Sequence, residues 1–242
     1  MRPYRVLTWH VHGGYLESLA RTGVEWYLPT RPGGDHGYTG KPPALAEFDN
    51  VHDVPVEAVP GLDLDAIVFQ NQRNYLEDQH EILTAAQRRL PRLYVEHDPP
   101  RANVTDSRHV VDDPDVLLVH VTAFNRLMWD SGATPTVVID HGMADPGVSW
   151  TGELERGVVV INDIATRGRR LGLDLFLEAR GLLPLDLVGL RSGAVGGLGE
   201  VDHRRLPAFM AGYRFFFHPA RYTSLGLAVI EAMLVGLPVV AL

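Results

Sequence analysis

The sequence predicts an α/β fold built from two domains, and three observations support this. Short apolar runs rich in Val, Ile and Leu alternate with helical patterns along most of the chain, which is typical of parallel sheets covered by helices. The alternation stops at residues 143–156, whose Gly, Pro and acidic residues are typical of a linker. A chain of 242 residues is long enough for two small domains. We therefore expect an N-terminal domain over 1–145 and a C-terminal domain over 156–242.

The first domain should begin with a strand and a glycine turn. An apolar run over 5–12 predicts the strand, and His12-Gly13-Gly14 predicts the turn. Gly13 and Gly14 would either adopt positive φ in a tight turn or let a substrate approach the backbone, and the sequence favours neither. Further strands are expected at 24–28, near 51–56, and at 66–70, 92–96, 116–121 and 136–139, with helices over 15–21, 75–89 and 123–131.

The second domain shows the same alternation over a shorter length. Its strands are expected at 157–161, 185–190, 215–217 and 239–242, and its helices over 171–180, over 206–211 and after Gly226. The chain stops at the end of a predicted strand.

The most informative segment is 217–242, because it places a carboxylate inside an apolar helix. Leu227, Ile230, Met233 and Leu234 recur at helical spacing, and Glu231 falls within the same stripe. A buried carboxylate is costly unless a partner hydrogen-bonds to it. The partner would be either a ligand or a nearby basic side chain such as His218.

The start of this helix is a candidate anion site. Thr223 and Ser224 are good N-cap residues, and the backbone N–H groups of Ser224, Leu225, Gly226 and Leu227 would then point towards an anion. The alternative is an ordinary capped helix without a ligand.

The basic residues are almost all arginines. Lys41 is the only lysine, so a phosphate group bound by the second half of the chain would need an arginine as its cationic side chain. A guanidinium can donate two hydrogen bonds to two oxygens of one phosphate. Arg167, Arg169 and Arg170 cluster before a predicted helix. They would either neutralise a diphosphate or form a solvated basic patch.

Histidine supplies two further hypotheses. His97 directly follows the strand 92–96 and should lie at the carboxyl edge of a parallel sheet, where ligands bind. Otherwise it is a loop histidine bonded to its own backbone. His10 and His12 would share one face of a strand and could bind zinc, as in a metal-dependent hydrolase, with histidines at other strand ends completing the site.

Composition excludes several classes of protein. The net charge of −8 argues against non-specific binding to nucleic acid. The chain has no cysteine, so it forms no disulfide, and this weakly favours a reducing compartment. No apolar stretch is long enough for a signal peptide or a transmembrane helix. We expect a cytoplasmic protein.

The segment 217–242 resembles the nucleotide-sugar site of the GT-B glycosyltransferases, specifically the large retaining class. That class carries the pattern P-S-x-x-E-G-F-G-L-x-x-x-E-A-M-A-x-G-x-P-V-V. The matching positions here are His218-Pro219, Leu225-Gly226-Leu227, Glu231-Ala232-Met233 and Gly236-Leu237-Pro238-Val239-Val240. Two other segments are similar to family stretches, namely 137–142 to V-I-P-N-G-V and 161–177 to G-R-L-x-x-x-K-G-x-D-x-L-L.

The resemblance implies roles for individual residues. Glu231 would hold the ribose hydroxyls, while His97 would lie near the donor sugar and the acceptor, with Gly13 and Gly14 in the acceptor wall. The family's first acid, which helps to place the donor sugar, falls on Thr223, so this chain has a hydroxyl group there instead of a carboxylate. The family's lysine falls on Leu171, so Arg169 or Arg170 would have to replace it.

The function implied is transfer of a sugar from a nucleotide-diphosphate sugar to a saccharide, lipid or small-molecule acceptor, with retention. The fold implied is a pair of Rossmann-like domains facing a cleft, with the second domain incomplete. His97 is the candidate catalytic residue. Arginines and a helix N-terminus would carry the phosphate charge, so we expect neither a metal ion nor a further cofactor.

Two alternatives remain at this point. One is a catalytically weakened nucleotide-sugar-binding protein, which Thr223, the missing lysine and the short second domain favour. The more distant one is the zinc hydrolase, which leaves the segment around Glu231 unexplained.

Overall fold

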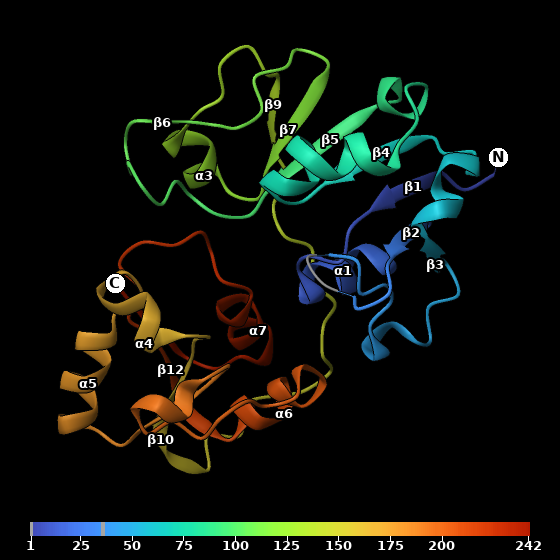
Figure 1. The fold of residues 1–242 in the computed structure, drawn as a ribbon. Coiled ribbons are helices and arrows are strands. Elements are labelled where there is room, and N and C mark those ends of the chain that lie inside the picture. The colour runs from blue at the N-terminus through green and yellow to red at the C-terminus, as the bar shows by residue number, and fades with distance from the viewer. Residues whose placement is uncertain (1, 35–36) are drawn as a thin grey trace. The chain divides into compact units, whose positions relative to one another are not determined.

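The computed structural model describes residues 2–34 and 37–242, which form two compact units. Unit 1 spans Met1–Gly142 and unit 2 spans Met143–Leu242. Each unit is built on a parallel sheet, and the α/β class predicted from the sequence is confirmed (Figure 1).

Unit 1 contains a seven-stranded parallel sheet with the order β3-β2-β1-β4-β5-β7-β9. The order runs outward in both directions from the central pair β1 and β4, which makes this pair the switch point of a doubly wound sheet. The strands are β1 (Arg5–Thr8), β2 (Glu25–Thr30), β3 (Val51–Pro55), β4 (Ala66–Phe69), β5 (Arg92–Glu96), β7 (Val116–His120) and β9 (Thr136–Val138). A separate parallel pair joins β6 (Ser107–Arg108) to β8 (Trp129–Asp130).

Helical segments cover both faces of this sheet. Alternate residues point to opposite faces, so Val6 packs in one apolar cluster with Leu16 of α1, whereas Leu7 packs in the other with Ile82 of α2. The helices are α1 (Gly13–Ala20), α2 (Gln79–Ile82) and α3 (Ala123–Met128), with short turns η1 (Pro43–Leu45), η2 (Val56–Gly61), η3 (Asn74–Asp78, a π-turn) and η4 (Gln87–Arg89).

The continuous helix predicted over 75–89 is wrong, because Thr84 and Gln87 interrupt it. The Thr84 N–H donates to the Gln87 side-chain oxygen, and the Gln87 N–H donates to the Thr84 hydroxyl. This reciprocal pair is a capping box that starts a new turn. The segment is therefore divided into η3, α2 and η4.

The first strand also ends earlier than predicted, at Thr8 instead of residue 12. Beyond it, the His10 N–H donates to the Gly37 carbonyl and the Val11 N–H donates to the Trp9 carbonyl, so the backbone leaves the sheet. The helix predicted over 123–131 stops at Met128, because Trp129 and Asp130 pair with β6.

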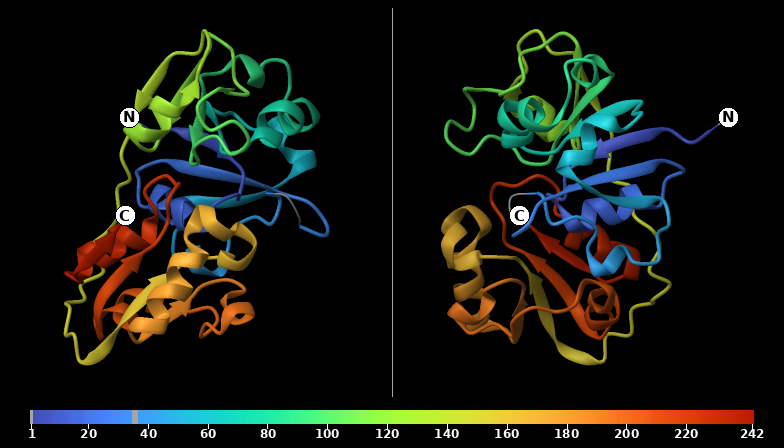
Figure 2. Two further views of the ribbon diagram at one scale, coloured as in Figure 1. Left: turned by 90° about the vertical axis from the view of Figure 1, so that its left-hand side faces the viewer. Right: turned by 45° about the vertical axis from the view of Figure 1, so that its right-hand side comes forward.

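Unit 2 contains a four-stranded parallel sheet with the order β11-β10-β12-β13. Its strands are β10 (Leu154–Val160), β11 (Leu185–Val188), β12 (Tyr213–His218) and β13 (Val239–Ala241). Its helices are α4 (Ile164–Arg167), α5 (Leu173–Leu182), α6 (Leu206–Ala211) and α7 (Leu227–Val235), with turns η5 (Gly168–Leu171), η6 (Ser192–Val195) and η7 (His203–Arg205). One apolar cluster holds residues of α6 and α7, and the other holds residues of α4 and α5. Figure 2 shows the ribbon from two further directions.

Helix α7 turns a different face to the core than its sequence predicts. Met233 is 64% exposed and Leu234 is 39% exposed, so the predicted apolar stripe is wrong. The buried apolar residues are Val229, Ala232 and Val235, because α7 packs against α6 and β12 through that side. Glu231 is nevertheless buried, next to Ala232.

Candidate active site

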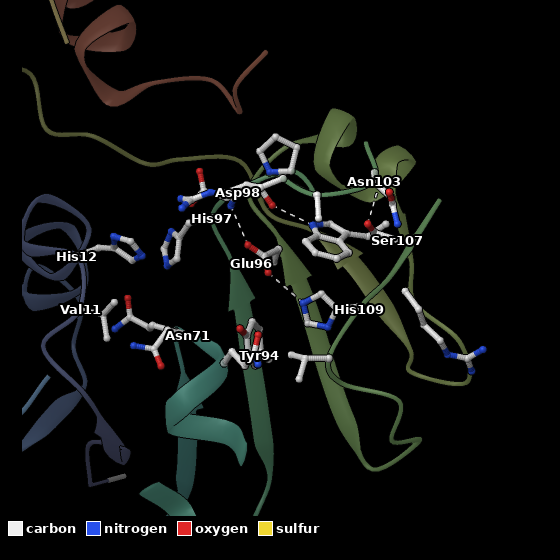
Figure 3. A pocket seen from close by; sticks show the side chains of 18 of the residues that line it. Val11, His12, Asn71, Tyr94, Glu96, His97, Asp98, Asn103, Ser107 and His109 are labelled. Carbon is white, nitrogen blue, oxygen red and sulfur yellow. Dashed lines mark hydrogen bonds and ion pairs between the residues drawn. The ribbon is translucent and has the colours of Figure 1, made fainter. Parts of the chain in front are cut away.

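Unit 1 carries a pocket of about 780 Å³ at the carboxyl ends of β1, β4 and β5 (Figure 3). Doubly wound sheets bind ligands at this edge, beside the switch point. The pocket is lined by 11–12, 70–72, 94, 96–99, 101–103, 106–110 and Trp129.

His97 lies in this pocket, directly after β5 as the sequence predicts. Its ring is 4.3 Å from the His12 ring and 4.6 Å from the Tyr15 ring, between ring centroids. Burial, with smaller effects from His12 and His141, lowers the pKa of His97 to about 2. The imidazole is therefore neutral near pH 7, and its Nε2 atom has no hydrogen-bond partner among the described residues. His97 can offer a neutral donor or acceptor to a ligand but not a positive charge.

Glu96 and His109 organise the loop that carries His97. The Val111 N–H donates to Nδ1 of His109, which leaves the proton on Nε2 to be donated to Glu96 at 3.0 Å. The other oxygen of Glu96 accepts the Asp98 N–H at 2.8 Å. Glu96 thereby fixes the backbone on both sides of His97.

Sequence reasoning missed the group of Glu96, His109 and Trp129. The Trp129 indole N–H donates to the Asp98 carbonyl, which anchors the same loop from the far side. Glu96 is the last residue of β5, so the predicted strand 92–96 already places it at the carboxyl edge. His109 and Trp129 lie outside the main sheet and carry no comparable pattern.

The glycines after β1 do not form the predicted turn. Helix α1 begins at Gly13, with His12 as its N-cap residue, and neither Gly13 nor Gly14 has positive φ. His12 makes no side-chain cap bond, so the first N–H groups of α1 are not capped by that side chain. The roles of Gly13 and Gly14 in ligand binding stay predictions.

The premise of the zinc hypothesis is wrong. His10 and His12 both lie beyond the end of β1, so they do not share a strand face. Nδ1 of His10 is within hydrogen-bond distance of the Gly40 carbonyl, whereas the His12 ring packs on His97. Within residues 2–34 and 37–242, no group of three or more His, Asp or Glu side chains is arranged to hold a metal ion.

In unit 2, Glu231 is 5% exposed and points its carboxylate at a histidine. Nε2 of His203, in η7, lies 2.7 Å from Oε1 of Glu231. The sequence suggested His218 as a protein partner, and the structure corrects this to His203. The His203 side chain is half exposed, so the hydrogen-bond partner of the buried Glu231 carboxylate is itself in contact with solvent.

Two buried polar atoms on the segment that leads to α7 lack partners among the described residues. They are Nδ1 of His218, at the end of β12, and Oγ of Ser224, two residues before the N-cap residue Gly226. The N-cap residue is Gly226, and no side chain caps the helix, so the predicted capping by Thr223 or Ser224 is wrong. The first N–H groups of α7 therefore lack a side-chain acceptor at the N-cap position. Leu225, just before the helix, is half exposed.

The predicted arginine cluster is organised by Asp174, in the first turn of α5. Arg169 pairs with Asp174, and so does Arg221, at 2.6 and 2.9 Å. The Arg221 guanidinium, with Arg169, holds the pKa of Asp174 below its usual range. Arg167 is exposed at the end of α4, and the Arg170 carbonyl accepts the N–H groups of Arg221 and Tyr222. Arg221 was not among the sequence candidates.

Gly172 brings the two motif-bearing segments of unit 2 together. Its φ is 78°, and a Cβ at this position would overlap the Pro219 carbonyl oxygen. Only glycine fits there, so the segment before α5 packs directly on the segment after β12. The cluster around Asp174 and the loop leading to α7 are neighbours for this reason.

Comparisons with known proteins give a family match within unit 2 and likenesses of fold. Residues 173–242 match the family model described as glycosyl transferases group 1. No curated protein sequence gives a significant match.

Solved structures extend the likeness beyond that segment. Sucrose-phosphate synthase from Thermosynechococcus elongatus is 17% identical, with a TM-score of 0.63 over 98% of this chain and 81% of that one. The fold is that of the GT-B glycosyltransferases. An O-GlcNAc transferase mutant of Thermobaculum terrenum is 16% identical, with a TM-score of 0.54 over 99% of this chain and 52% of that one.

A further match is a mutant of S. aureus TarM, solved in complex with UDP, fondaparinux and α-GlcNAc-glycerol. It is 14% identical, with a TM-score of 0.52 over 77% of this chain and 43% of that one. The chain thus spans about half the length of two of these proteins. Among the described residues, no helix has the length and apolar character needed to cross a membrane.

Proposed function

We propose that this protein transfers a sugar from a nucleotide-diphosphate sugar to an acceptor. The observation that carries the proposal is the buried carboxylate of Glu231 on α7, inside the segment that matches glycosyl transferases group 1. Two ribose hydroxyls could donate to such a carboxylate and share it with His203. The family match supports this role.

The diphosphate would bind where unit 2 gathers positive charge. Arg169 and Arg221 lie beside Asp174, and Gly172 packs them against the segment that leads to α7. The N–H groups at the start of α7 add partial positive charge. When the bond between the sugar and the diphosphate breaks, its electron pair moves to the phosphate oxygen, and these groups would stabilise the charge that develops there. We propose that no metal ion is needed for this step.

Unit 1 would supply the acceptor side. In a reaction with retention, the acceptor oxygen bonds to the anomeric carbon on the face that the diphosphate leaves. The departing phosphate oxygen can then take the acceptor's proton, so the protein need not supply a strong base. His97, neutral and partly free to bond, suits the holding of a hydroxyl group. The amides of Gly13 and Gly14 at the start of α1 are the other proposed contacts.

A weakened nucleotide-sugar-binding protein is the second candidate. Thr223 stands where the family has an acid, and Leu171 stands where it has a lysine. Leu171 is buried in the core of unit 2, so its position offers no cation. This candidate predicts binding of the nucleotide without turnover. For either function we propose the cytoplasm as the site of action, because nucleotide sugars and a cysteine-free chain both fit that compartment.

The test is thermal unfolding with a panel of nucleoside diphosphates and nucleotide sugars. A ligand that binds only the native state raises the melting temperature according to its affinity. We expect one base to give a shift that is lost in Glu231→Ala and kept in Glu178→Ala, an exposed glutamate on α5. No shift with any nucleotide, from folded protein, would contradict the proposal.

Turnover then separates the two candidates. Release of nucleoside diphosphate from the bound nucleotide sugar, in EDTA as well as with added magnesium, is expected of a metal-independent transferase. Binding without release would favour the binding protein, and release that EDTA abolishes would contradict metal independence.

A further inference from the structure

The pocket of unit 1 holds positive charges only in paired form. Its lining contains two guanidiniums, and each lies beside a carboxylate. Arg101 pairs with Asp98, and Arg108 pairs with Asp112 at 2.6 Å. The same lining contains the carboxylates of Glu96, Asp98 and Asp106, so its acidic groups outnumber its guanidiniums. An anionic ligand would meet net repulsion there.

Histidine does not change this balance. Burial lowers the pKa values of His12 and His97, so both rings are neutral near pH 7. The third histidine of the lining, His109, accepts the Val111 N–H at Nδ1, which requires the proton to be on Nε2.

The lining also contains hydrogen-bonding atoms that lack a partner within the described residues. The Gln70 amide donates to the Thr8 hydroxyl and to the Trp9 carbonyl, and a carbonyl can only accept. The orientation of the amide is therefore fixed, and Oε1 is the atom left without a partner. Gln70 is 3% exposed, so this acceptor is not compensated by bulk water. Nε2 of His97 is likewise buried and has no hydrogen-bond partner among the described residues.

Neither atom is open to solvent, so a ligand reaches them only after a lining side chain shifts. A hydroxyl group would then satisfy them, whereas a phosphate would not. Gln70 Oε1 needs a donor, and a phosphate dianion offers only acceptors. A hydroxyl both donates and accepts. The remaining polar lining is uncharged as well, with the amides Asn71, Gln72 and Asn103 and the hydroxyl of Ser107. The volume is within the range of pockets that enclose small molecules.

We infer that the acceptor bound by unit 1 is an uncharged polyhydroxylated molecule, a saccharide or polyol that carries no phosphate. That this molecule is an acceptor rests on the proposed function. Its binding to unit 1 can nevertheless be measured without any donor.

The experiment compares matched pairs of ligands by saturation-transfer NMR on the whole chain, with nucleoside diphosphate absent and then present. The probes are glucose, fructose, glycerol and myo-inositol, each beside its monophosphate. We expect at least one uncharged probe to bind, and its monophosphate to bind at least ten-fold more weakly.

Two variants examine the charge argument. Asp112 lies outside the pocket lining, and Asp112→Asn removes the nearer of the two carboxylates that pair with Arg108, the other being Asp130 at 3.8 Å. The asparagine keeps an oxygen that can accept the Ala133 N–H. This variant should gain affinity for the monophosphates. Arg214→Gln, which alters an exposed pair with Glu155 in unit 2, is the matched control and should change nothing.

The outcomes distinguish this inference from the proposed function. Preferential binding of the monophosphates by the wild type, or no binding of any probe, overturns the inference, and the nucleotide shift in unit 2 would still support glycosyl transfer. Binding of an uncharged probe without any nucleotide shift supports the inference on ligand class while the proposed function fails.

Discussion

The two units use opposite means to create a binding site at the edge of a parallel sheet. In unit 1 the pocket histidine His97 is buried and neutral, and each guanidinium of the lining is paired with a carboxylate. In unit 2 two arginines pair with a partly exposed acid, Asp174, and the buried acid Glu231 is joined to a half-exposed histidine. The difference shows that one fold class can present either a neutral surface or a charged one, because the loops after the strands decide it.

The largest effect should come from Gly172→Val, which would separate the two segments that carry the unit 2 site. A side chain there meets the Pro219 carbonyl and must also adopt a φ of 78°. We expect a loss of about 3 kcal/mol or more in the stability of unit 2, with nucleotide binding lost. Urea unfolding and nucleotide titration would measure this. Sugar binding by unit 1 should persist, and its loss would show that the units are not independent.

Acid should act next most strongly, and on unit 1. Burial lowers the pKa of His97 to about 2, whereas the unfolded chain titrates near 6.5. The unfolded state therefore binds the proton first, so the contribution of His97 is complete above pH 6.5 and is lost as the pH falls towards 2. At pH 5 the loss should be about 2 kcal/mol.

Urea unfolding of the wild type and of His97→Gln between pH 7.5 and 5 checks this. The variant lacks the group, so its stability should fall less steeply over the same range. Parallel pH profiles for the two proteins would mean that His97 is not the group that titrates.

Charge removal in unit 2 should have an effect of intermediate size. Arg221→Gln removes one of the two guanidiniums at Asp174 and should weaken nucleoside diphosphate binding about ten-fold. The loss should shrink as salt is raised, because the cluster is exposed. Isothermal titration at two ionic strengths gives the comparison, and Arg214→Gln is again the control.

The smallest effect should be a gain. Gly181 lies in α5 and does not need positive φ, and a methyl group added at its Cα would have no neighbouring atom within 4 Å. Gly181→Ala should therefore stabilise unit 2 by about 0.5–1 kcal/mol, which urea unfolding would measure. This change is the counterpart of Gly172→Val in the same unit. If Gly181→Ala lowered the free energy of unfolding, the expectation that alanine fits this position of α5 would be wrong.

The sequence predicted the parallel sheets well because strand periodicity and glycine-proline punctuation are local signals. It placed β5 and α6 at their observed bounds, and it placed His97 at the carboxyl edge. It failed where tertiary contacts decide the outcome. The pair of Thr84 and Gln87 breaks a helix that its own pattern favours, and packing against α6 rotates the buried face of α7.

The site shows the same division. Glu231 and the arginine cluster were each predicted from a local pattern, in the segments 217–242 and 161–177 respectively. The partners His203, Arg221 and His109 come from segments far away in the sequence, so no spacing rule links them to Glu231, Asp174 or Glu96. The unpartnered oxygen of Gln70 depends on the orientation of one amide, which only the folded neighbours determine.

The central place of β1 has a consequence for how unit 1 assembles. β1 pairs with β2 nearby in the sequence, but its other neighbour is β4, where Val6 stands opposite Ala66. A nascent chain would therefore hold one edge of β1 open until that distant strand has been synthesised. Contacts this far apart slow folding, because the intervening chain must be ordered before they form. During synthesis, the open edge of β1 could pair with strands of other chains, so unit 1 should need protection from aggregation until β4 has formed.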